Sequence, residues 1–456
     1  GDADQSNLAD IYFGRGNSPT TCGNTISGNT LSNTLNTRDA NISGGVVLNT
    51  STLKTYCSIQ PAIDDPLTVN GHTLQVQAGT YNESLNINKS LTLKGAQANV
   101  CAPTRSGAET IINCVNGIGI NASGVTLNGF TIQGQTTAAG PGFGYAVFMA
   151  PGSTGTKLLN NIIKDNVIGS SLSNQGASPA QVQITCNWFK DNNNPGAATG
   201  SGIYTDEYVS GGIFSNVLIN NNKFSGNNSA GIDISTTQAI MASTGVTIDG
   251  NEFSNNYRAT FLYNVTNSSF TNNEVSGSFF ATSGDVRIYG GVNNFNIANN
   301  KFAAGTDVRA IRISTDGVVN NSGITVNYNS FTGYTASNNA IEIVSGYPGT
   351  MAATCNWFGS TVPATVAAQI TGTVSYIPYL TSGADASAAI GFQTTEVCTA
   401  CALVATPSST NVTCPTQADG TASVTLTGGT GPYTYDWGVY GSTQTITGLA
   451  AGSYPV

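Results

Sequence analysis

Charged side chains are rare in this sequence, yet several of them recur at equivalent positions in its second half. Only 9% of the 456 residues are Asp, Glu, Lys or Arg. Between positions 203 and 343, short triplets repeat in which two apolar residues flank one central residue. If the triplets are strands, alternation sends the central residue to the face opposite its neighbours. The predicted outward residues are Tyr204, Asp233, Leu262, Arg287, Arg312 and Glu342.

A second outward column is expected two residues further along each strand. Its members are Asp206, Ser235, Asn264, Tyr289, Ser314 and Val344. Tyrosine rings can stack on sugar faces, and arginine forks can hold a carboxylate through two hydrogen bonds. The two columns are therefore a candidate saccharide-binding face. Its candidate residues are Tyr204, Asp206, Asp233, Arg287, Tyr289, Arg312 and Glu342.

Two alternatives to this binding face stay open. Hydrolysis of a glycosidic bond needs two carboxylates about 5–10 Å apart, which Asp206 and Asp233 on neighbouring strands would provide. Calcium-assisted elimination needs more carboxylates around the ion, and no clear calcium motif supports it. The structural alternative is a surface ladder in which Arg312 pairs with Glu342, worth about 0–1 kcal/mol. No catalytic residue, metal or cofactor is assigned, and a non-catalytic role is favoured over a lyase or a hydrolase.

The net charge and the lack of long apolar runs limit the kinds of binding partner that are expected. The net charge is −9 and the pI about 4.5, so no basic stripe for nucleic acid is expected. No apolar run approaches the roughly 20 residues of a membrane span. The expected partners are glycans or other surface proteins, with self-assembly through further modules as another possibility.

Nine cysteines without metal-binding spacing indicate an oxidising compartment. The candidate disulfides are Cys22 with Cys57, Cys101 with Cys114, and one bridge among Cys398, Cys401 and Cys414, for which Cys401 with Cys414 is preferred. Cys186 and Cys355 hold equivalent places in two copies of Asn-Trp-Phe, too far apart to pair with each other. They are predicted to be thiols facing the core or a turn.

A repeated signature, Asn-x-(Phe/Ile/Val), determines the predicted fold. It occurs nine times, at gaps of 22 to 35 residues. The nine asparagines are Asn128, Asn161, Asn187, Asn222, Asn251, Asn273, Asn300, Asn329 and Asn356. In a right-handed parallel β-helix, coils of short strands stack at about 4.8 Å, and asparagines of successive turns can form an amide ladder. Asparagine also tolerates the left-handed backbone that such turns need. The signature therefore predicts an all-β solenoid.

The start and end of this region resemble a known family. Residues 58–64, Ala78-Gly79-Thr80-Tyr81-Asn82-Glu83 and residues 87–96 look like the opening of pectin-lyase-like right-handed β-helix domains. Residues 355–359 and 372–380 look like their closing segment. The resemblance implies the fold but not the activity, because this fold carries lyases, hydrolases, epimerases and adhesins. Residues 58–64 are also expected to form a short amphipathic helix.

The C-terminal region resembles a second family. Residues 411–414, 419–421, 428–437 and 446–454 closely resemble the SprB repeat, a small immunoglobulin-like module of Bacteroidota surface adhesins. The resemblance implies export by the type IX route and display on the cell surface. Because the chain stops at Val456, we expect an incomplete β-sandwich and a polypeptide that continues.

The predicted organisation has four parts. They are a cap region at 1–57, the β-helix at 58–380, a linker at 381–402 and the truncated immunoglobulin-like module at 403–456. The function expected for this arrangement is a non-catalytic adhesin or filament segment of a larger extracellular protein.

Overall fold

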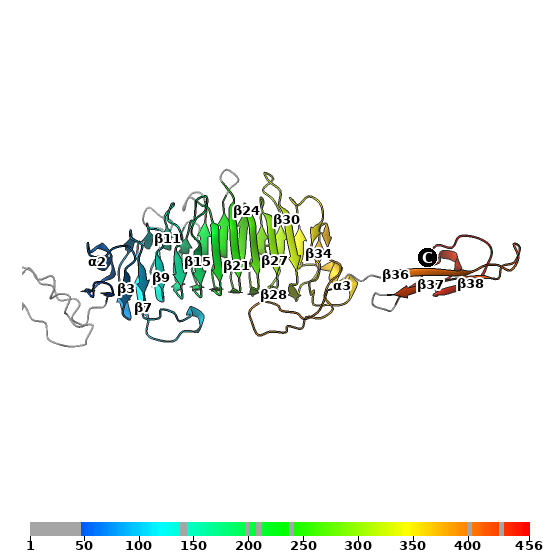
Figure 1. Cartoon of the computed structure of the whole chain (residues 1–456), viewed down its shortest axis with the longest axis horizontal. Coiled ribbons are helices and arrows are strands. Elements are labelled where there is room, and N and C mark those ends of the chain that lie inside the picture. The colour runs from blue at the N-terminus through cyan, green and yellow to red at the C-terminus, as the bar shows by residue number, and fades with distance from the viewer. Residues whose placement is uncertain are drawn as a thin grey trace, which may run out of the picture. The chain divides into compact units, whose positions relative to one another are not determined.

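The computed structural model describes residues 47–136, 144–196, 200–206, 212–236, 241–398, 404–427 and 433–456. These residues divide into two compact units. The first contains the described residues up to Tyr376 together with Leu380–Thr395, and the second contains Ile377–Tyr379 and the described residues from Glu396 onward. Figure 1 shows the first unit as a stack of short strands and the second as a small sheet.

The first unit is a parallel β-helix, as predicted, in which successive turns add strands to three sheets. Sheet A has 14 strands, sheet B has 10 and sheet C has 11. Among the described residues of this unit, strands of neighbouring turns pair in parallel, and only β1 pairs antiparallel, with β2 and β3.

Sheet A contains, in spatial order, β2 (Thr55–Tyr56), β1 (Val47–Asn49), β3 (Thr73–Val76), β6 (Thr92–Lys94), β9 (Thr126–Asn128), β12 (Lys157–Leu159), β15 (Val182–Thr185), β18 (Ser215–Asn220), β21 (Ser243–Asp249), β24 (Val265–Thr271), β27 (Asn293–Ala298), β30 (Ser322–Asn327), β33 (Met351–Ala352) and β35 (Val374–Ser375). Sheet B contains β4 (Gly79–Tyr81), β7 (Thr110–Asn113), β10 (Phe130–Gln133), β13 (Ile162–Lys164), β16 (Trp188–Lys190), β19 (Lys223–Ser225), β22 (Glu252–Ser254), β25 (Glu274–Ser276), β28 (Lys301–Ala303) and β31 (Ser330–Thr332). Sheet C contains β5 (Leu85–Ile87), β8 (Ile118–Ile120), β11 (Tyr145–Met149), β14 (Ile168–Ser171), β17 (Ser201–Thr205), β20 (Ala230–Ser235), β23 (Thr260–Tyr263), β26 (Gly284–Ile288), β29 (Arg309–Ile313), β32 (Ile341–Ile343) and β34 (Ile370–Thr371).

Two short helices lie near the ends of the stack. The predicted helix is α2 (Ile59–Asp64), which buries Ile59, Ala62 and Ile63. Its Ser58 makes no side-chain cap, and the Glu83 carboxylate instead accepts the main-chain N–H groups of Ile59 and Gln60 at 2.8–3.1 Å. At the far end, α3 (Pro363–Ala368) buries Val366. Sequence reasoning missed α3.

An asparagine ladder runs between sheets A and B through eight of the nine signature asparagines. From Asn161 to Asn356, each side-chain amide donates to the side-chain oxygen of the next asparagine at 2.8–3.0 Å. The same oxygen also accepts the main-chain N–H of the preceding ladder asparagine, as between Asn222 and Asn251. The ladder residues are almost wholly buried. The ladder thus satisfies main-chain groups that the turns leave unpaired.

Asn128 is not part of this ladder, and the prediction for it was wrong. Its position on β9 corresponds to Leu159 in the next turn, and it bonds to Asn99 and Asn160 instead. A second ladder, which the sequence prediction missed, connects Asn166, Asn192, Asn227 and Asn256 at 2.8–3.1 Å.

The left-handed backbone position lies one residue before each ladder asparagine, not at the asparagine itself. The residues there have φ between 52° and 64°, and they are Asn160, Cys186, Asn221, Gly250, Asn272, Asn299, Tyr328 and Cys355. Hydrogen bonding, and not a left-handed backbone conformation, therefore explains why asparagine recurs at the signature positions.

Stacked phenylalanines fill the interior beside the ladder. Phe189, Phe224 and Phe253 stack with ring centroids 4.8–5.0 Å apart. The next turn has Val275 in this column, and Phe270 from sheet A packs between Phe253 and Phe302 there. The column then continues through Phe331 and Phe358 at 5.2–5.4 Å.

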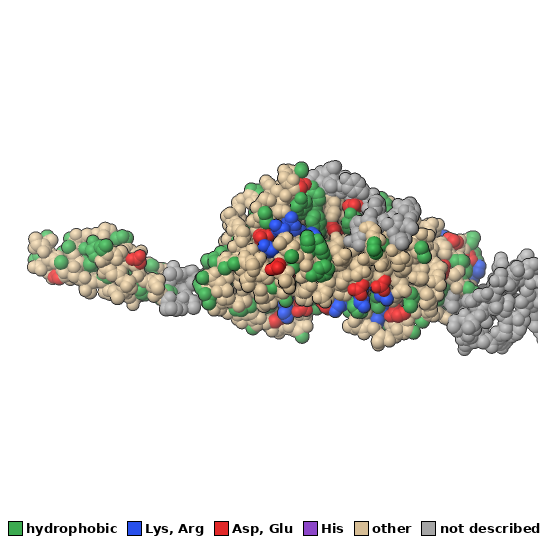
Figure 2. Space-filling model, turned by 180° about the vertical axis from the view of Figure 1, so that it is seen from behind, with side chains coloured by type: hydrophobic (Ala, Val, Ile, Leu, Met, Phe, Trp, Pro, Cys, Tyr) green, Lys and Arg blue, Asp and Glu red, His purple; other side chains and the backbone are tan. Residues whose placement is uncertain are grey.

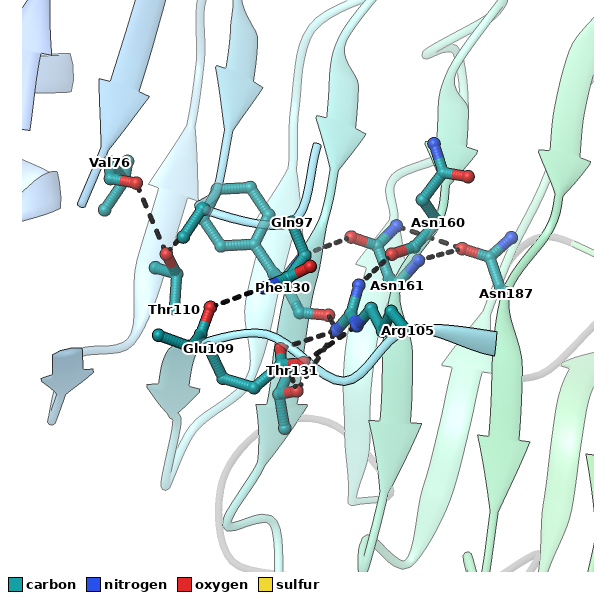
Figure 3. Close-up of polar contacts among 12 residues, drawn as sticks. Val76, Gln97, Arg105, Glu109, Thr110, Phe130, Thr131, Asn160, Asn161 and Asn187 are labelled. Carbon is teal, nitrogen blue, oxygen red and sulfur yellow. Dashed lines mark hydrogen bonds and ion pairs between the residues drawn. The ribbon is translucent and has the colours of Figure 1, made fainter. Parts of the chain in front are cut away.

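A loop between β6 and β7 is fastened across the side of the stack. It contains the short 3₁₀ helix η2 (Ala102–Thr104), and its Arg105 side chain is completely buried. Arg105 donates to the Glu109 carboxylate at 2.7 and 2.9 Å, to the carbonyl of Phe130 at 2.9 Å and to the carbonyl of Asn160 (Figure 3). Arg105 is therefore saturated by protein acceptors and has a structural role.

Two of the predicted disulfides are contradicted, whereas Cys57 is disulfide-bonded as expected. Cys101 bonds to Cys186, 85 residues away, because the fastened loop reaches the turn before β16. Cys114, its predicted partner, is a buried free thiol, and Cys414 is an exposed free thiol, which excludes the predicted bridge to Cys401. Cys57, Cys355 and Cys398 are also disulfide-bonded, so Cys186 and Cys355 are not the free thiols expected. Cys22 and Cys401 lie outside the described residues.

The second unit contains one antiparallel sheet of three strands. They are β36 (Val404–Thr410), β37 (Gly420–Thr427) and β38 (Thr445–Leu449), with the 3₁₀ helix η3 (Gly438–Tyr440) before β38. Its small core is formed by Ala422, Val424, Trp437, Ile446 and Leu449.

Candidate functional site

The predicted outward columns lie on sheet C, with one correction at β23. Asp233 pairs with Phe261 and not with Leu262, which is completely buried. The second column at this turn therefore contains Tyr263 in place of Asn264. A shift of one residue exchanges the two faces of a strand, and Phe261-Leu262-Tyr263 is apolar or aromatic throughout, so its pattern did not fix the register.

The corrected columns define a surface that we call the sheet C stripe. Its first column consists of Tyr204, Asp233, Phe261, Arg287, Arg312 and Glu342. Its second column consists of Asp206, Ser235, Tyr263, Tyr289, Ser314 and Val344. All seven candidate residues from the sequence lie on this one stripe.

The end of the stripe nearer the N-terminus is acidic and largely buried. The Tyr204 hydroxyl donates to Asp206 at 2.7 Å, and the Ser235 hydroxyl donates to Asp233. Burial is the main cause that raises the pKa of Asp233 to about 6. Ser235 and Arg258 oppose the rise, and the nearby Asp206 adds to it. Asp233 is thus a carboxyl group that changes charge just below neutral pH.

The middle of the stripe combines arginine with aromatic rings. The guanidinium of Arg258 lies 5.0–5.3 Å from the ring centroids of Tyr257, Phe261 and Phe280. Phe280 stacks on Tyr257 at 3.9 Å, and Phe279 beside it is 51% exposed. Sequence reasoning missed Arg258 because it precedes β23 and falls outside both columns. Its position next to Tyr257, in a chain with few charged residues, could have identified it as a candidate.

Arg287 lies one turn further along, next to like charge. Its guanidinium lies 5.0 Å from the Tyr289 ring and donates to the Ser314 hydroxyl at 2.6 Å. Burial, together with the charges of Arg312 and Arg258, lowers its pKa to about 10, although Tyr289 and Glu342 oppose the fall. Arg287 is therefore held in an environment that disfavours its charge.

The far end of the stripe contains the pair expected of an ion-pair ladder. Arg312 contacts Glu342 at 2.6 Å, and Arg309 contacts the same carboxylate at 3.4 Å. One carboxylate thus serves two arginines. The pair accounts for Arg312, but it does not extend to Arg287.

The outer face of sheet B provides a contrast. There Lys223 pairs with Glu252 at 2.6 Å and Lys301 with Glu274 at 3.2 Å, in half-exposed pairs. Such surface pairs are worth about 0–1 kcal/mol each. Figure 2 shows one group of basic side chains beside hydrophobic surface and another in which basic and acidic side chains intermingle. Only sheet C combines arginines with an aromatic surface among the described residues.

Two further properties concern the described part of the chain. It contains no group of three or more His, Cys, Asp or Glu residues arranged to hold a metal ion. None of its helices is long and apolar enough to cross a membrane.

Comparisons with known proteins identify the C-terminal module. The SprB repeat family matches residues 406–438, which confirms the resemblance seen in the sequence. A cell surface glycoprotein of Methanothermus fervidus is 41% identical over 92 residues, which are 19% of this chain and 14% of that protein. The two matches indicate a surface protein.

The solved structures that resemble this chain are more distant. The catalytic unit of a GH87 α-1,3-glucanase from Streptomyces thermodiastaticus aligns with 69% of this chain and 64% of its own, at 13% identity and a TM-score of 0.38. ORF18 of Geobacillus virus E2 aligns with 63% of this chain and 56% of its own, at 14% identity and a TM-score of 0.35. Neither similarity assigns an activity to this chain. The described structure is a parallel β-helix followed by a module that matches the SprB repeat.

Proposed function

We propose that this protein is a non-catalytic segment of an extracellular surface adhesin, in which the β-helix presents the sheet C stripe to a ligand. The observation that carries this proposal is the cluster of Arg258, Arg287, Phe261 and Tyr289 on one face. Aromatic and arginine side chains supply most of the binding energy in protein recognition sites.

A rigid stack suits this role. Main-chain ladders and buried amide ladders fix each turn relative to the next, so the side chains on the stripe need little ordering when a ligand binds. The SprB-like module supports display on a cell surface. Bacteroidota origin, type IX export and a filament built from further modules are parts of the same proposal.

The test is adhesion of beads coated with the whole chain to an array of surface glycans and surface proteins. The double variant Phe261→Ala/Tyr289→Ala removes the aromatic rings of the stripe. We expect it to reduce bead retention at least tenfold. The matched control is Trp188→Ala, which removes an aromatic ring that lies between Lys190 and Lys223 on sheet B.

We expect the control to retain wild-type adhesion. Equal loss in both variants, or no retention of wild-type beads on any surface, contradicts the proposal. Thermal unfolding of the three proteins establishes that each is folded before adhesion is compared.

A second candidate function is hydrolysis of a glycosidic bond, and one observation favours it. The pKa of Asp233 is about 6, which suits a general acid, and Asp206 lies on the neighbouring turn as a second carboxylate. Release of reducing ends from neutral and acidic polysaccharides between pH 4 and 8 tests this candidate. Turnover that disappears in Asp233→Asn would replace the adhesin proposal, and its absence would remove the hydrolase.

A further inference from the structure

Two arginines on or beside the sheet C stripe, Arg258 and Arg287, form no ion pair with a described residue. We infer that the ligand of this face is a saccharide bearing a carboxylate or sulfate group, bound by Arg258 and Arg287 while its ring packs on Phe261 and Tyr289. The inference rests on the proposed adhesin function and specifies the chemistry of its ligand.

Arg105 shows what a structural arginine looks like in the same molecule. It is buried, forms an ion pair with Glu109 and donates to two main-chain carbonyls. Among the described residues, Arg258 and Arg287 form no ion pair, and the Nε of Arg258 is buried without a hydrogen-bond partner. A guanidinium in that state gains strongly from an anion that accepts two of its hydrogen bonds.

Repulsion between the arginines also favours an anionic ligand. Arg287 and Arg312 are direct neighbours in adjacent strands, and the pKa of Arg287 is lowered by both Arg312 and Arg258. A bound anion would relieve this repulsion, because opposite charge favours the protonated guanidinium.

The carboxylates near the cluster are already engaged. Glu342 contacts Arg309 and Arg312, and Asp316 accepts a hydrogen bond from the Tyr263 hydroxyl. Asp233 accepts one from Ser235, and Asp206 accepts one from Tyr204. Asp233 still attracts Arg258, and Glu342 attracts Arg287, but neither carboxylate forms an ion pair with these two arginines.

The aromatic rings beside the arginines supply a surface for a sugar ring. Phe261 and Tyr289 lie 5.7 Å apart, and Tyr263 and Tyr289 lie 5.9 Å apart, all on neighbouring strands of the stripe. The CH faces of a pyranose gain dispersion and hydrophobic contact on such rings. An inorganic anion would not use these rings, which is why a charged saccharide fits better.

Calorimetric titration of the whole chain with three oligosaccharides of equal length tests the inference. One is neutral, one carries uronate carboxylates and one carries sulfate esters. We expect binding of at least one anionic oligosaccharide at least tenfold tighter than binding of the neutral one, and weaker binding as salt is raised. The preferred anionic oligosaccharide distinguishes carboxylate from sulfate as the source of the charge.

Two variants of one residue separate charge from geometry. Arg287→Gln should weaken anionic binding at least tenfold, and Arg287→Lys should recover part of it, since lysine keeps the charge without the fork. Lys301→Gln on sheet B is the control and should leave the affinity unchanged.

The outcomes separate the two proposals. Equal affinity for neutral and anionic oligosaccharides, lost in Phe261→Ala/Tyr289→Ala, overturns the anionic ligand and leaves the adhesin function standing. Unchanged anionic binding in Arg287→Gln also overturns the inference. No binding of any oligosaccharide, together with no bead adhesion, overturns both.

Discussion

The asparagine ladder and the sheet C stripe run along the same β-helix but differ in composition. The ladder places one residue type at eight successive turns, from Asn161 to Asn356. The stripe places a different side chain at nearly every turn, including Asp233, Phe261 and Arg287. Each ladder residue must match the turns on both sides of it, whereas a stripe residue need not bond to its counterparts in the neighbouring turns and is free to differ. Uniform columns therefore reflect the needs of the stack, and the mixed column is where a ligand can be specified.

The largest effect is expected inside the ladder. Asn251→Ala removes the donors to Asn273 and to the carbonyl of Ile219, and the acceptor of the Asn222 main-chain N–H. Because each buried group left unpaired costs about 1–3 kcal/mol, we expect a loss of roughly 3–5 kcal/mol. Chemical denaturation measures it, with Asn296→Ala on the exposed face of β27 as a control near zero. A small loss at Asn251 would show that the ladder is not essential to the stack.

The next effect concerns the loop fastened across the stack. Replacing Cys101 and Cys186 by serine opens a link between residues 85 apart in sequence. We expect a loss of about 2–5 kcal/mol, with unchanged glycan binding, because the link does not involve the stripe. Chemical denaturation of the double variant, which keeps Arg105 and Glu109, measures the loss of stability. Reduced binding at equal folding would show that the two regions are coupled.

A third prediction concerns Asp285, which is buried at the start of β26. Burial raises its pKa to about 7. The folded protein therefore binds its proton more tightly than the unfolded chain, and the stability from this group is lost as pH rises from about 4 through 7. Asp285→Asn should increase stability at pH 8 by an amount on the order of 1 kcal/mol and leave pH 4 nearly unchanged. Urea denaturation at both pH values measures the change in the free energy of unfolding. A gain in stability that occurs only at low pH would contradict the prediction.

The smallest effect on stability is expected on the stripe. Arg287→Gln loses the hydrogen bond to Ser314, but it breaks no ion pair and relieves repulsion from Arg312. Because these effects oppose each other, the free energy of unfolding should change by about 0.5 kcal/mol or less. The same variant should lose binding at least tenfold. A large loss of stability would erase the contrast between ladder and stripe, because the stripe would then also hold the fold together.

The sequence predicted the ladder and most of the stripe because both follow periodic patterns. It misplaced the register at β23, where Phe261, Leu262 and Tyr263 are all compatible with burial. It also missed Asn166 and its partners, although they recur five residues after ladder asparagines. This recurrence is visible in the sequence, but the prediction used only the Asn-x-(Phe/Ile/Val) signature.

The number and spacing of the repeats, read from the sequence, predicted the parallel β-helix. An amphipathic segment predicted the short helix α2, and a family resemblance predicted the SprB-like module. Only the tertiary structure decided that Cys101 bonds to Cys186, that Arg105 pairs with Glu109 and that Arg258 packs against Tyr257. The physical reason is that a local pattern fixes which face a residue occupies. Contacts between distant loops and turns depend on the path of each loop, which the pattern does not encode.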